Sequence, residues 1–569
     1  MGKYTQANRS ISIHTPLGED VLLLEKIKGE EAVSRLFRFE LDLWAEQPVP
    51  FDKLLGQAAT LKISFPNGSG RQVNGILTEV TKGGRLGELL RYRAVLSPAA
   101  WLLTHRVQSR IFQHQTVPEI LQTVCRDDWQ LSVISHLTAT YPKRNYCVQY
   151  RESDWDFVNR LMEEEGITYY FEHDDKGHQL VLADHALAYP ELSQFASVAF
   201  DDAQGGDRVA PTIREWEQTQ ELGSYRYTLR DYTFEKPEDK LTAERNASGD
   251  VEAGAVPHPL SLQRKINSVE MLEVYDYPGE FAHDHEEITK EGKVNPQGLE
   301  KLQDDLERRS RIRQEAESTA QLRMRGQGDC GHFLPGRLFQ LTRHFDGAPT
   351  PGEADRYVLT RVELTAAIEG AYTTQGGERR EFATRFECLP AKWPLRPARR
   401  TPQPHIEGPQ TATVVGPAGN EVFVDKFGRI KVRFHWDRQD HQGADCSCWI
   451  RVAQFWAGKG WGAFFWPRVG HEVVVAFEDG DPDRPLVVGS VYNAVNMPPL
   501  ELPDYVTITG VKSLIYGGSP GTNFNSIFIY DTPGKEFVHL HSEKNERQHS
   551  ENHKLHYVAG MQFSINGDY

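Results

Sequence analysis

The sequence predicts a mainly β protein of the α+β class that is divided into several domains, and three observations support this prediction. The chain has 569 residues, several times the size of a typical domain, so one hydrophobic core cannot serve all of it. Short segments that alternate apolar and polar residues recur along most of the chain, as half-buried strands do. A proline-rich stretch separates these segments into two unequal parts. Hydrophobic residues make up 39% and charged residues 25%, which is ordinary globular composition.

Residues 1–390 are predicted to form strand-rich subdomains with inserted helices. Alternation is clear over 36–43 and again over 90–96, each of which reads as a half-buried strand. A first helix is expected to begin near Pro118, because proline in the first turn loses no helical hydrogen bond.

A second helix is expected after Ser153, whose hydroxyl can cap the free N–H groups, with Asp156 three residues later as in a capping box. Gly166 should end it, and a strand over 167–171 should follow. Four apolar residues share one face of this helix: Trp155, Val158, Leu161 and Met162. A longer charged helix over about 299–322 is interpreted as a solvated helix at the rim of the domain.

Seven prolines occur between Pro390 and Pro417, so residues 391–410 are predicted to be an extended linker. Residues 411–495 follow with five short strands separated by glycine and Asp-Pro turns, and one of these strands is expected over 448–456. Five strands in a segment of this length suit a small closed barrel of the oligosaccharide/oligonucleotide-binding (OB) type, which leaves no free strand edges.

Residues 496–569 alternate in the same way but contain little apolar bulk. In the strand predicted around 538–541, Val538 and Leu540 should face one side and His539 and His541 the other. Such strands cannot bury a core by themselves, so we expect them to pair with partner chains.

The overall charge and the cysteine content exclude several classes of protein. A net charge of −16 argues against a general nucleic-acid binder, which needs a basic surface. Six cysteines are too few for a disulfide scaffold of this size, so we expect buried free thiols. The first twenty residues lack an apolar segment of signal-peptide length, and no apolar run is long enough for a spanning helix. We therefore expect a protein made in the cytoplasm that has no signal peptide and no stable membrane insertion.

Six segments in a fixed order then resemble a known family. The chain is similar to the valine–glycine repeat protein G (VgrG) family, the trimeric spikes of type VI secretion systems, which are related to phage tail hub and spike proteins. The segments are QYRESDWDFVNRLMEEEGITYYFEH (149–173), VYDYPGEF (274–281), LPGRLFQLTRH (334–344), DKFGRIKVRFHWDR (425–438), CWIRVAQFWAGKGWGAFFWPRVGHEVVVAFEDGDPDRPLVVGSVYN (448–493) and GVKSLIYGGSPGTNFNSIFIYD (510–531).

This resemblance implies a structural protein that catalyses nothing. It implies a homotrimer with a phage-hub-like base (1–390), an OB-fold barrel (411–495), and the truncated beginning of an intertwined three-stranded β-helix needle (496–569). The hub would dock on a hexameric tube protein of the Hcp type. A PAAR-type tip protein and effectors would ride on the needle, with an adaptor or chaperone to load them. Sheath contraction would then deliver the spike from the cytoplasm into a target envelope.

Two glycine-rich motifs invite sharper interpretations. Residues 326–331 match G-x-G-x-x-G, but a helix is expected before them and a strand after, the reverse of the dinucleotide-binding order. Residues 517–521 match G-x-S-x-G, yet a proline follows Ser519 and the surroundings are β only, unlike a nucleophile elbow. We interpret both as turns.

Histidines and basic aromatic segments are the remaining candidates for sites. The segment 283–287 (HDHEE) and five C-terminal histidines could ligate a metal, the histidines on the axis of a trimer. Solvated side chains are the favoured interpretation of both groups. The five histidines are His539, His541, His549, His553 and His556. Lys431, Arg433, Phe434 and Trp436 could suit single-stranded nucleic acid. Residues 405–500, however, hold nine Lys+Arg against eleven Asp+Glu, which is no electrostatic funnel. We assign no catalytic, cofactor-binding or metal-ligating residue and no cofactor.

Two alternative functions stay open. The chain could be the hub-spike of another contractile system, such as a phage tail or a tailocin, with the same fold and trimer. It could also be the trimmed core of a spike that carries a C-terminal enzymatic effector. In each case, we expect winding of the three chains to start at the barrel-to-needle junction, about 490–515.

Overall fold

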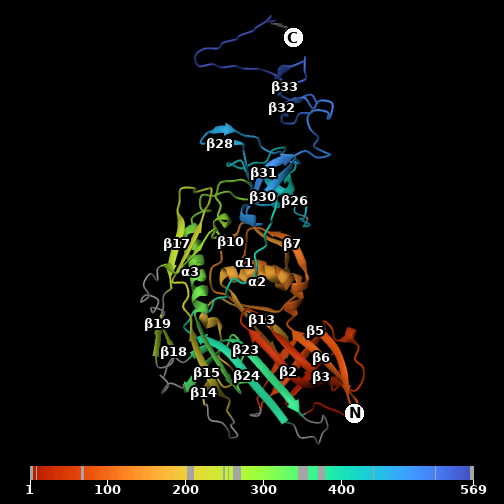
Figure 1. The fold of residues 1–569 in the computed structure, drawn as a ribbon, viewed down its shortest axis with the longest axis vertical. Helices are drawn as coiled ribbons and strands as arrows, with labels where there is room; N and C mark the ends of the chain where they lie inside the picture. The colour runs from red at the N-terminus through yellow and green to blue at the C-terminus, as the bar shows by residue number, and fades with distance from the viewer. Residues whose placement is uncertain are drawn as a thin grey trace.

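The computed structural model is elongated, with the N-terminus in a broad base and the C-terminus at the opposite, narrow end (Figure 1). We call residues 4–390 the base, 410–491 the upper barrel, 493–507 the connector and 508–541 the terminal sheet. The structure describes residues 4–7, 9–65, 69–201, 210–247, 250–253, 256–259, 271–343, 356–369, 379–439, 441, 443–519 and 521–563.

Twelve strands of the base form one continuous sheet that curls into two barrel-like halves. Their order is β1-β4-β5-β6-β3-β2-β23-β22-β14-β15-β21-β24, and an additional β23–β24 pairing closes the second half. The bounds are β1 (Ile11–His14), β2 (Leu23–Ala32), β3 (Arg38–Ala45), β4 (Ala58–Ser64), β5 (Gly70–Leu86), β6 (Leu89–Ser97), β14 (Ser197–Phe200), β15 (Thr212–Gln220), β21 (Leu322–Gly328), β22 (Leu338–Arg343), β23 (Arg356–Glu369) and β24 (Arg379–Pro390).

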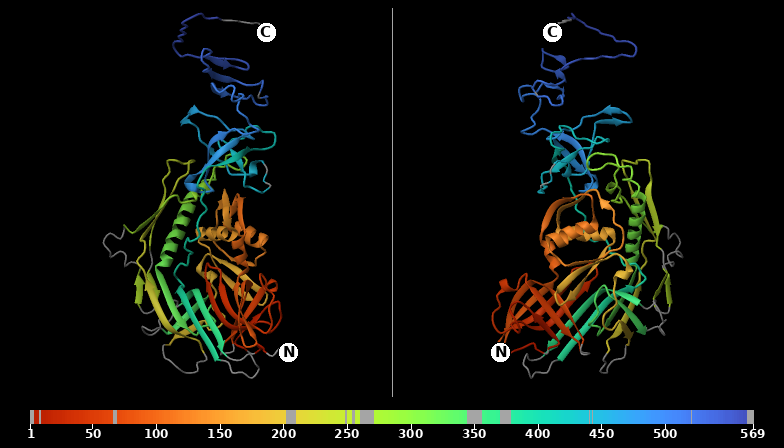
Figure 2. Two further views of the ribbon diagram at one scale, coloured as in Figure 1. Left: turned by 45° about the vertical axis from the view of Figure 1, so that its right-hand side comes forward. Right: turned by 180° about the vertical axis from the view of Figure 1, so that it is seen from behind.

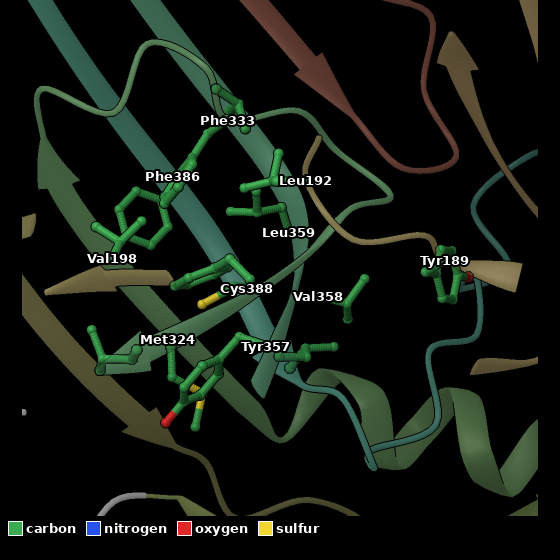
Figure 3. Close-up of a cluster of buried hydrophobic side chains, with 14 of the residues drawn as sticks. Tyr189, Leu192, Val198, Met324, Phe333, Tyr357, Val358, Leu359, Phe386 and Cys388 are labelled. Carbon is green, nitrogen blue, oxygen red and sulfur yellow. The ribbon is translucent and has the colours of Figure 1, made fainter. Parts of the chain in front are cut away.

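Strand β23 belongs to both halves, because its start pairs with β22 and its later part with β2. One core therefore includes Leu364 and Ala366 together with the side chains of β1–β6. The other core gathers aromatic and sulfur side chains such as Met324, Phe333 and Cys388 (Figure 3). A single long strand thus joins two hydrophobic cores.

A layer with two helices lies above the first half of the sheet (Figure 1). Helix α1 (Val117–Leu121) begins with a complete capping box between Thr116 and Glu119 and continues as a π-helix over 122–128. Helix α2 (Asp154–Glu165) begins where Ser153 accepts a hydrogen bond from the N–H of Asp156, and it ends at Gly166 with φ +69°. Both predicted starts are confirmed. The strands of this layer are β7 (Val107–Phe112), β8 (Gln115–Thr116), β9 (Val133–His136), β10 (Lys143–Arg144), β11 (Cys147–Ser153), β12 (Thr168–Asp174) and β13 (Gly177–Ala183).

The flank of the base consists of helix α3 (Leu302–Ala320) packed on small sheets. Its strands are β16 (Arg226–Asp231), β17 (Leu241–Asn246), β18 (Asp250–Ala253), β19 (Val256–Pro259) and β20 (Glu273–Asp276). The interpretation of α3 as a solvated rim helix is wrong. Arg309 is 1% exposed, Leu306 is fully buried, and the helix lies between α2 and the flank strands. Its inward-facing arginines, such as Arg309 and Arg313, can be buried because they face carboxylates of neighbouring elements.

The upper barrel is a five-stranded sheet in the order β26-β25-β30-β31-β27. A bridge between Ile430 and Ile450 links its two edge strands and closes it. Residues 448–456 do not form the single strand expected, because they divide into β27 and the first strand of a separate hairpin, β28–β29. The bounds are β25 (Gln410–Val415), β26 (Lys431–Phe434), β27 (Arg451–Val452), β28 (Trp456–Gly458), β29 (Trp461–Ala463), β30 (Glu472–Phe477) and β31 (Pro485–Val491).

The segment 391–409 is extended, as expected for a proline-rich stretch, but it is bound to the base. The Arg396 guanidinium lies 2.7 Å from Glu315, and the backbone N–H groups of Arg400 and Thr401 donate to Glu163. It therefore follows the surface of the base up to the upper barrel instead of spanning open solvent.

The remaining helical segments of the described residues are 3₁₀ helices of three to seven residues, and the last strands form a small sheet that is followed by an extended segment to residue 563. These helices are η1 (Phe51–Lys53), η2 (Ala99–His105), η4 (Ala186–Ala188), η7 (Ala282–Asp284), η9 (Gly443–Asp445) and η10 (Glu478–Gly480). The terminal sheet is an antiparallel meander of β32 (Ile508–Lys512), β33 (Ser526–Tyr530) and β34 (Phe537–His541). Among the described residues, no helix combines the length and apolar character needed to cross a membrane.

Candidate functional site

The upper barrel is seated on the base through a shared hydrophobic core. Ile111, Tyr146 and Val148 come from strands β7 and β11 of the base or the loop between them, yet they pack among the barrel's own buried side chains. The backbone N–H of Val148 donates to the Asp483 carboxyl at 2.6 Å. Burial raises the pKa of that carboxyl well above its usual range. The contact between base and barrel is therefore built like a domain interior.

Arg429 is the centre of an ionic cluster at this contact. Its guanidinium is 1% exposed and lies next to Asp425 of the barrel at 2.6 Å and Glu286 of the base at 3.1 Å. Glu235, also of the base, approaches it to 3.7 Å. Phe234 and Phe427 flank the guanidinium, with ring centroids 5.2 and 5.4 Å from its central carbon.

Three carboxylates thus share one arginine, and two of the three have a raised pKa. The pKa of Glu286 is raised to about 7, chiefly by burial and also by the nearby carboxylates of Glu235 and Asp425, which together outweigh the lowering effect of Arg429. Burial likewise raises the pKa of Glu235. A proton on one of these carboxyls would relieve the repulsion between them. The cluster is therefore sensitive to pH near neutrality. Sequence reasoning missed it, because its members are distant in the chain.

The terminal sheet exposes apolar side chains on a face that nothing in the described chain covers. The pairing register puts Ile527 opposite Leu540 and Ile529 opposite Val538, so the four share one face. Their exposed fractions run from 43% for Ile529 to 65% for Val538. This register confirms the alternation predicted for Val538 and Leu540. Figure 1 shows the sheet standing clear of the barrel.

The predicted metal-ligand candidates are used in other ways. His285 lies 3.2 Å from Asp305, and His283 lies 3.7 Å from Asp284. His541 stacks on Phe524 with ring centroids 4.7 Å apart. Within the described ranges, no group of three or more His, Cys, Asp or Glu has the geometry of a metal site. All six cysteines are buried free thiols, as predicted.

Of the two glycine-rich motifs interpreted as turns, the first begins inside a strand and the second lies in a loop. Gly326 and Gly328 belong to strand β21, which follows a helix, and a Cβ on Gly326 would lie 2.3 Å from the Phe386 ring. In the second motif, the N–H of Gly517 donates to Glu421, and the N–H of Ser519 donates to Asn523. Pro520 of that motif lies outside the described residues, as do the last six residues of the predicted needle segment.

The basic and aromatic side chains considered for nucleic acid are mostly interior. Lys431 and Phe434 are each 1% exposed, and Trp436 stacks on Phe434 with ring centroids 5.2 Å apart. Of this set, only Arg433 is exposed. The aromatic residues of β26 therefore belong to the barrel core.

Comparisons with known proteins agree with this architecture. A family model of the phage tail baseplate hub (GPD) matches residues 30–370. A model of the type VI secretion system/phage-baseplate injector OB domain matches residues 420–492. Two solved structures share the fold. One is a type VI secretion component of E. coli, described as similar to the T4 bacteriophage tail proteins gp27 and gp5, with TM-score 0.56 and 20% identity, covering 84% of this chain and 100% of that chain. The other is a Francisella PdpA–VgrG complex, with TM-score 0.55 and 8% identity, covering 94% of this chain and 88% of that chain.

Relatives in sequence are more similar still. The type VI secretion system spike protein VgrG1c of Pseudomonas aeruginosa is 37% identical over 557 residues, which cover 98% of this chain and 71% of that protein. VgrG1a of the same organism is 37% identical over 548 residues, covering 96% of this chain and 79% of that protein. VgrG3 of Vibrio cholerae is 30% identical over 553 residues, covering 94% of this chain and 50% of that protein. The chain therefore belongs to the VgrG family of structural type VI secretion system spike proteins.

Proposed function

We propose that this spike works as a homotrimer whose terminal sheets wind together into a needle. The observation that carries the proposal is the uncovered apolar face of the terminal sheet, with Val538 65% and Leu540 56% exposed. Water-exposed apolar strands of this kind gain stability by pairing between chains. Symmetric winding of three copies would cover each face with side chains of the next copy.

The proposal includes the domain roles and the partners. Residues 1–390 form the hub that docks on a hexameric tube protein, 391–410 the linker, 411–495 the OB barrel, and 496–569 the start of the needle. A tip protein and effectors ride at the needle end, and sheath contraction delivers the spike from the cytoplasm. The role is mechanical, with no catalytic step assigned to the chain. The buried contact between barrel and base supports this role, because it suits a part that transmits force.

Light scattering on the purified chain tests the assembly. A homotrimer should have three times the chain mass of 64.7 kDa, about 194 kDa. A stable species of one chain mass at micromolar concentration would contradict the proposal. Loss of secretion on deleting residues 496–569, with tube-protein co-purification retained, would separate the needle role from the hub role. Retention of secretion without these residues would contradict a needle that is required for export.

A further inference from the structure

The upper barrel carries a second apolar surface that the winding of the terminal sheets leaves unexplained. The hairpin β28–β29 and its flanks, which we call the aromatic hairpin (455–466), present six aromatic side chains. Their exposed fractions run from 39% for Trp466 to 80% for Phe455. The six are Phe455, Trp456, Trp461, Phe464, Phe465 and Trp466. An exposed apolar patch of this kind marks an interaction surface.

Contacts within the single chain hold the aromatic hairpin in one conformation. Trp456 and Trp461 lie edge to face with ring centroids 5.2 Å apart. Gly458 lets the Trp461 ring lie directly against the backbone, where a Cβ would be 2.3 Å from that ring. The Gln454 side chain accepts a hydrogen bond from the N–H of Phe465 at 2.9 Å. A preorganised surface loses little entropy on binding.

The connector (493–507) is the other exposed apolar segment next to the barrel. Val495 is 89% exposed and Val506 70%, and Met497, Leu502 and Tyr505 are also exposed. The connector contains turns but no helix or strand, and three of its residues are Pro498, Pro499 and Pro503. Proline-rich extended segments bind well to aromatic surfaces, because proline has little conformational freedom left to lose.

The two surfaces also have opposite charge. The aromatic hairpin (455–466) contains Lys459 and no acidic residue, while Arg468 just beyond it is paired with Glu421 at 3.2 Å. Residues 493–507 contain Glu501 and Asp504 and no basic residue. Opposite charges at the rim of an apolar contact favour this pairing over pairing of either surface with itself.

Within one chain the two surfaces do not meet. The aromatic hairpin projects from one side of the barrel, while the chain leaves for the terminal sheet from the other side, in Figure 1 and in both views of Figure 2. In an assembly with rotational symmetry, by contrast, the connector of one copy would face the hairpin of the next. Such head-to-tail contacts close into a ring. We propose that the aromatic hairpin of each copy binds the proline-rich connector of the neighbouring copy.

This inference rests on the proposed homotrimer and adds the residues that join its copies above the base. The test uses two full-length variants, Lys459→Cys and Glu501→Cys, co-expressed and treated with a short bismaleimide. Both positions are exposed, and the six native thiols are buried, so background reaction should be small. The mixed protein should give a covalent dimer band on a denaturing gel, and either variant alone should lose that band at least tenfold.

Light scattering on the same samples separates the two ideas. A trimer with the covalent dimer supports the inference. A trimer without it overturns the hairpin–connector contact and leaves the homotrimer standing; the hairpin would then face a different protein. A single-chain mass overturns the homotrimer and, with it, this inference. As a second measurement, Lys459→Glu should lower the melting temperature of the trimer, and adding Glu501→Lys should restore it. Failure of that rescue would contradict the charge pairing.

Discussion

At the scale of single residues, Glu286 links the stability of the contact between the base and the upper barrel to pH. Its carboxyl has a pKa of about 7 in the folded chain against 4.5 for an ordinary glutamate, chiefly because it is buried. The folded state therefore holds the proton more tightly than the unfolded state between these two values. Stability contributed by this group is present at low pH and falls as pH rises from about 4.5 to about 7.

We expect Glu286→Gln to flatten this dependence by removing the titrating group. The difference in unfolding free energy between pH 5 and pH 8 should shrink by on the order of 2 kcal/mol. Urea unfolding at the two pH values, followed by tryptophan fluorescence, measures it. Glu287→Gln is the matched control, since Glu287 pairs with Lys426 at a more exposed position. Equal slopes for the parent and Glu286→Gln would contradict the assignment.

Gly326 offers a second test at this scale, because its motif resembles a nucleotide-binding loop but its role is packing. A Cβ would lie 2.3 Å from the Phe386 ring, which is 3% exposed in the core. Gly326→Ala should lower the unfolding free energy by about 1–3 kcal/mol, as overpacking does. Gly408→Ala, where a Cβ meets nothing within 4 Å, should change it by less than about 0.5 kcal/mol. Denaturant midpoints compare the two, and equal stability of both variants would exclude a packing role.

At the scale of elements, helix α3 is held in the base by charge. Arg309 is 1% exposed and contacts Asp284 at 3.1 Å and Asp305 at 3.4 Å. Arg309→Met would remove the buried guanidinium that faces Asp284 and Glu165 of neighbouring elements, while Asp305 would keep Arg308 at 2.9 Å. We expect a loss of about 3–5 kcal/mol, the usual effect of breaking a buried pair. Arg311→Met, two residues along and 59% exposed, should change stability by no more than about 1 kcal/mol. Thermal unfolding checks both, and similar melting points would contradict the ionic anchoring of α3.

Elements whose signals are local could be predicted from the sequence. The start and end of α2 could be predicted because Ser153, which caps the helix, and Gly166, which ends it with a positive φ, lie within the same short segment. The burial of α3 was not, because Arg309 depends on Asp284 and Glu165, which come from other elements. Likewise, residues 448–456 read as one strand, since their alternation does not reveal that β27 ends and a separate hairpin begins.

At the scale of the whole molecule, the connector and terminal sheet should govern assembly. A chain ending at Asn493 keeps the barrel strands, all of which end by Val491, but loses the segments proposed to join the copies. We expect its mass by light scattering to fall toward that of one chain on dilution, while the full chain stays near three. If the shortened chain is as trimeric as the parent, the hub alone drives assembly and winding does not begin at 490–515.

The order of the parts along the chain could be predicted from the sequence, but the contacts between the parts could not. The proline-rich boundary and the family resemblance indicated hub, barrel and needle strands in order. The Arg429 cluster could not be foreseen, because Glu235 and Glu286 lie far from Asp425 in the chain. The exposed aromatic hairpin was also missed, since aromatic residues in a strand-rich segment usually indicate a core.

The side chains of Ile111, Tyr146 and Val148 inside the barrel core determine how a thrust along the molecule would travel. A push on the barrel would pass through these close-packed side chains directly into strands of the base, in parallel with the segment 391–409, which is hydrogen-bonded to both parts. The covalent connection is thus not all that holds the two parts together. A protease cut within 391–409 should leave the barrel packed on the base, because the shared core around Ile111, Tyr146 and Val148 stays intact.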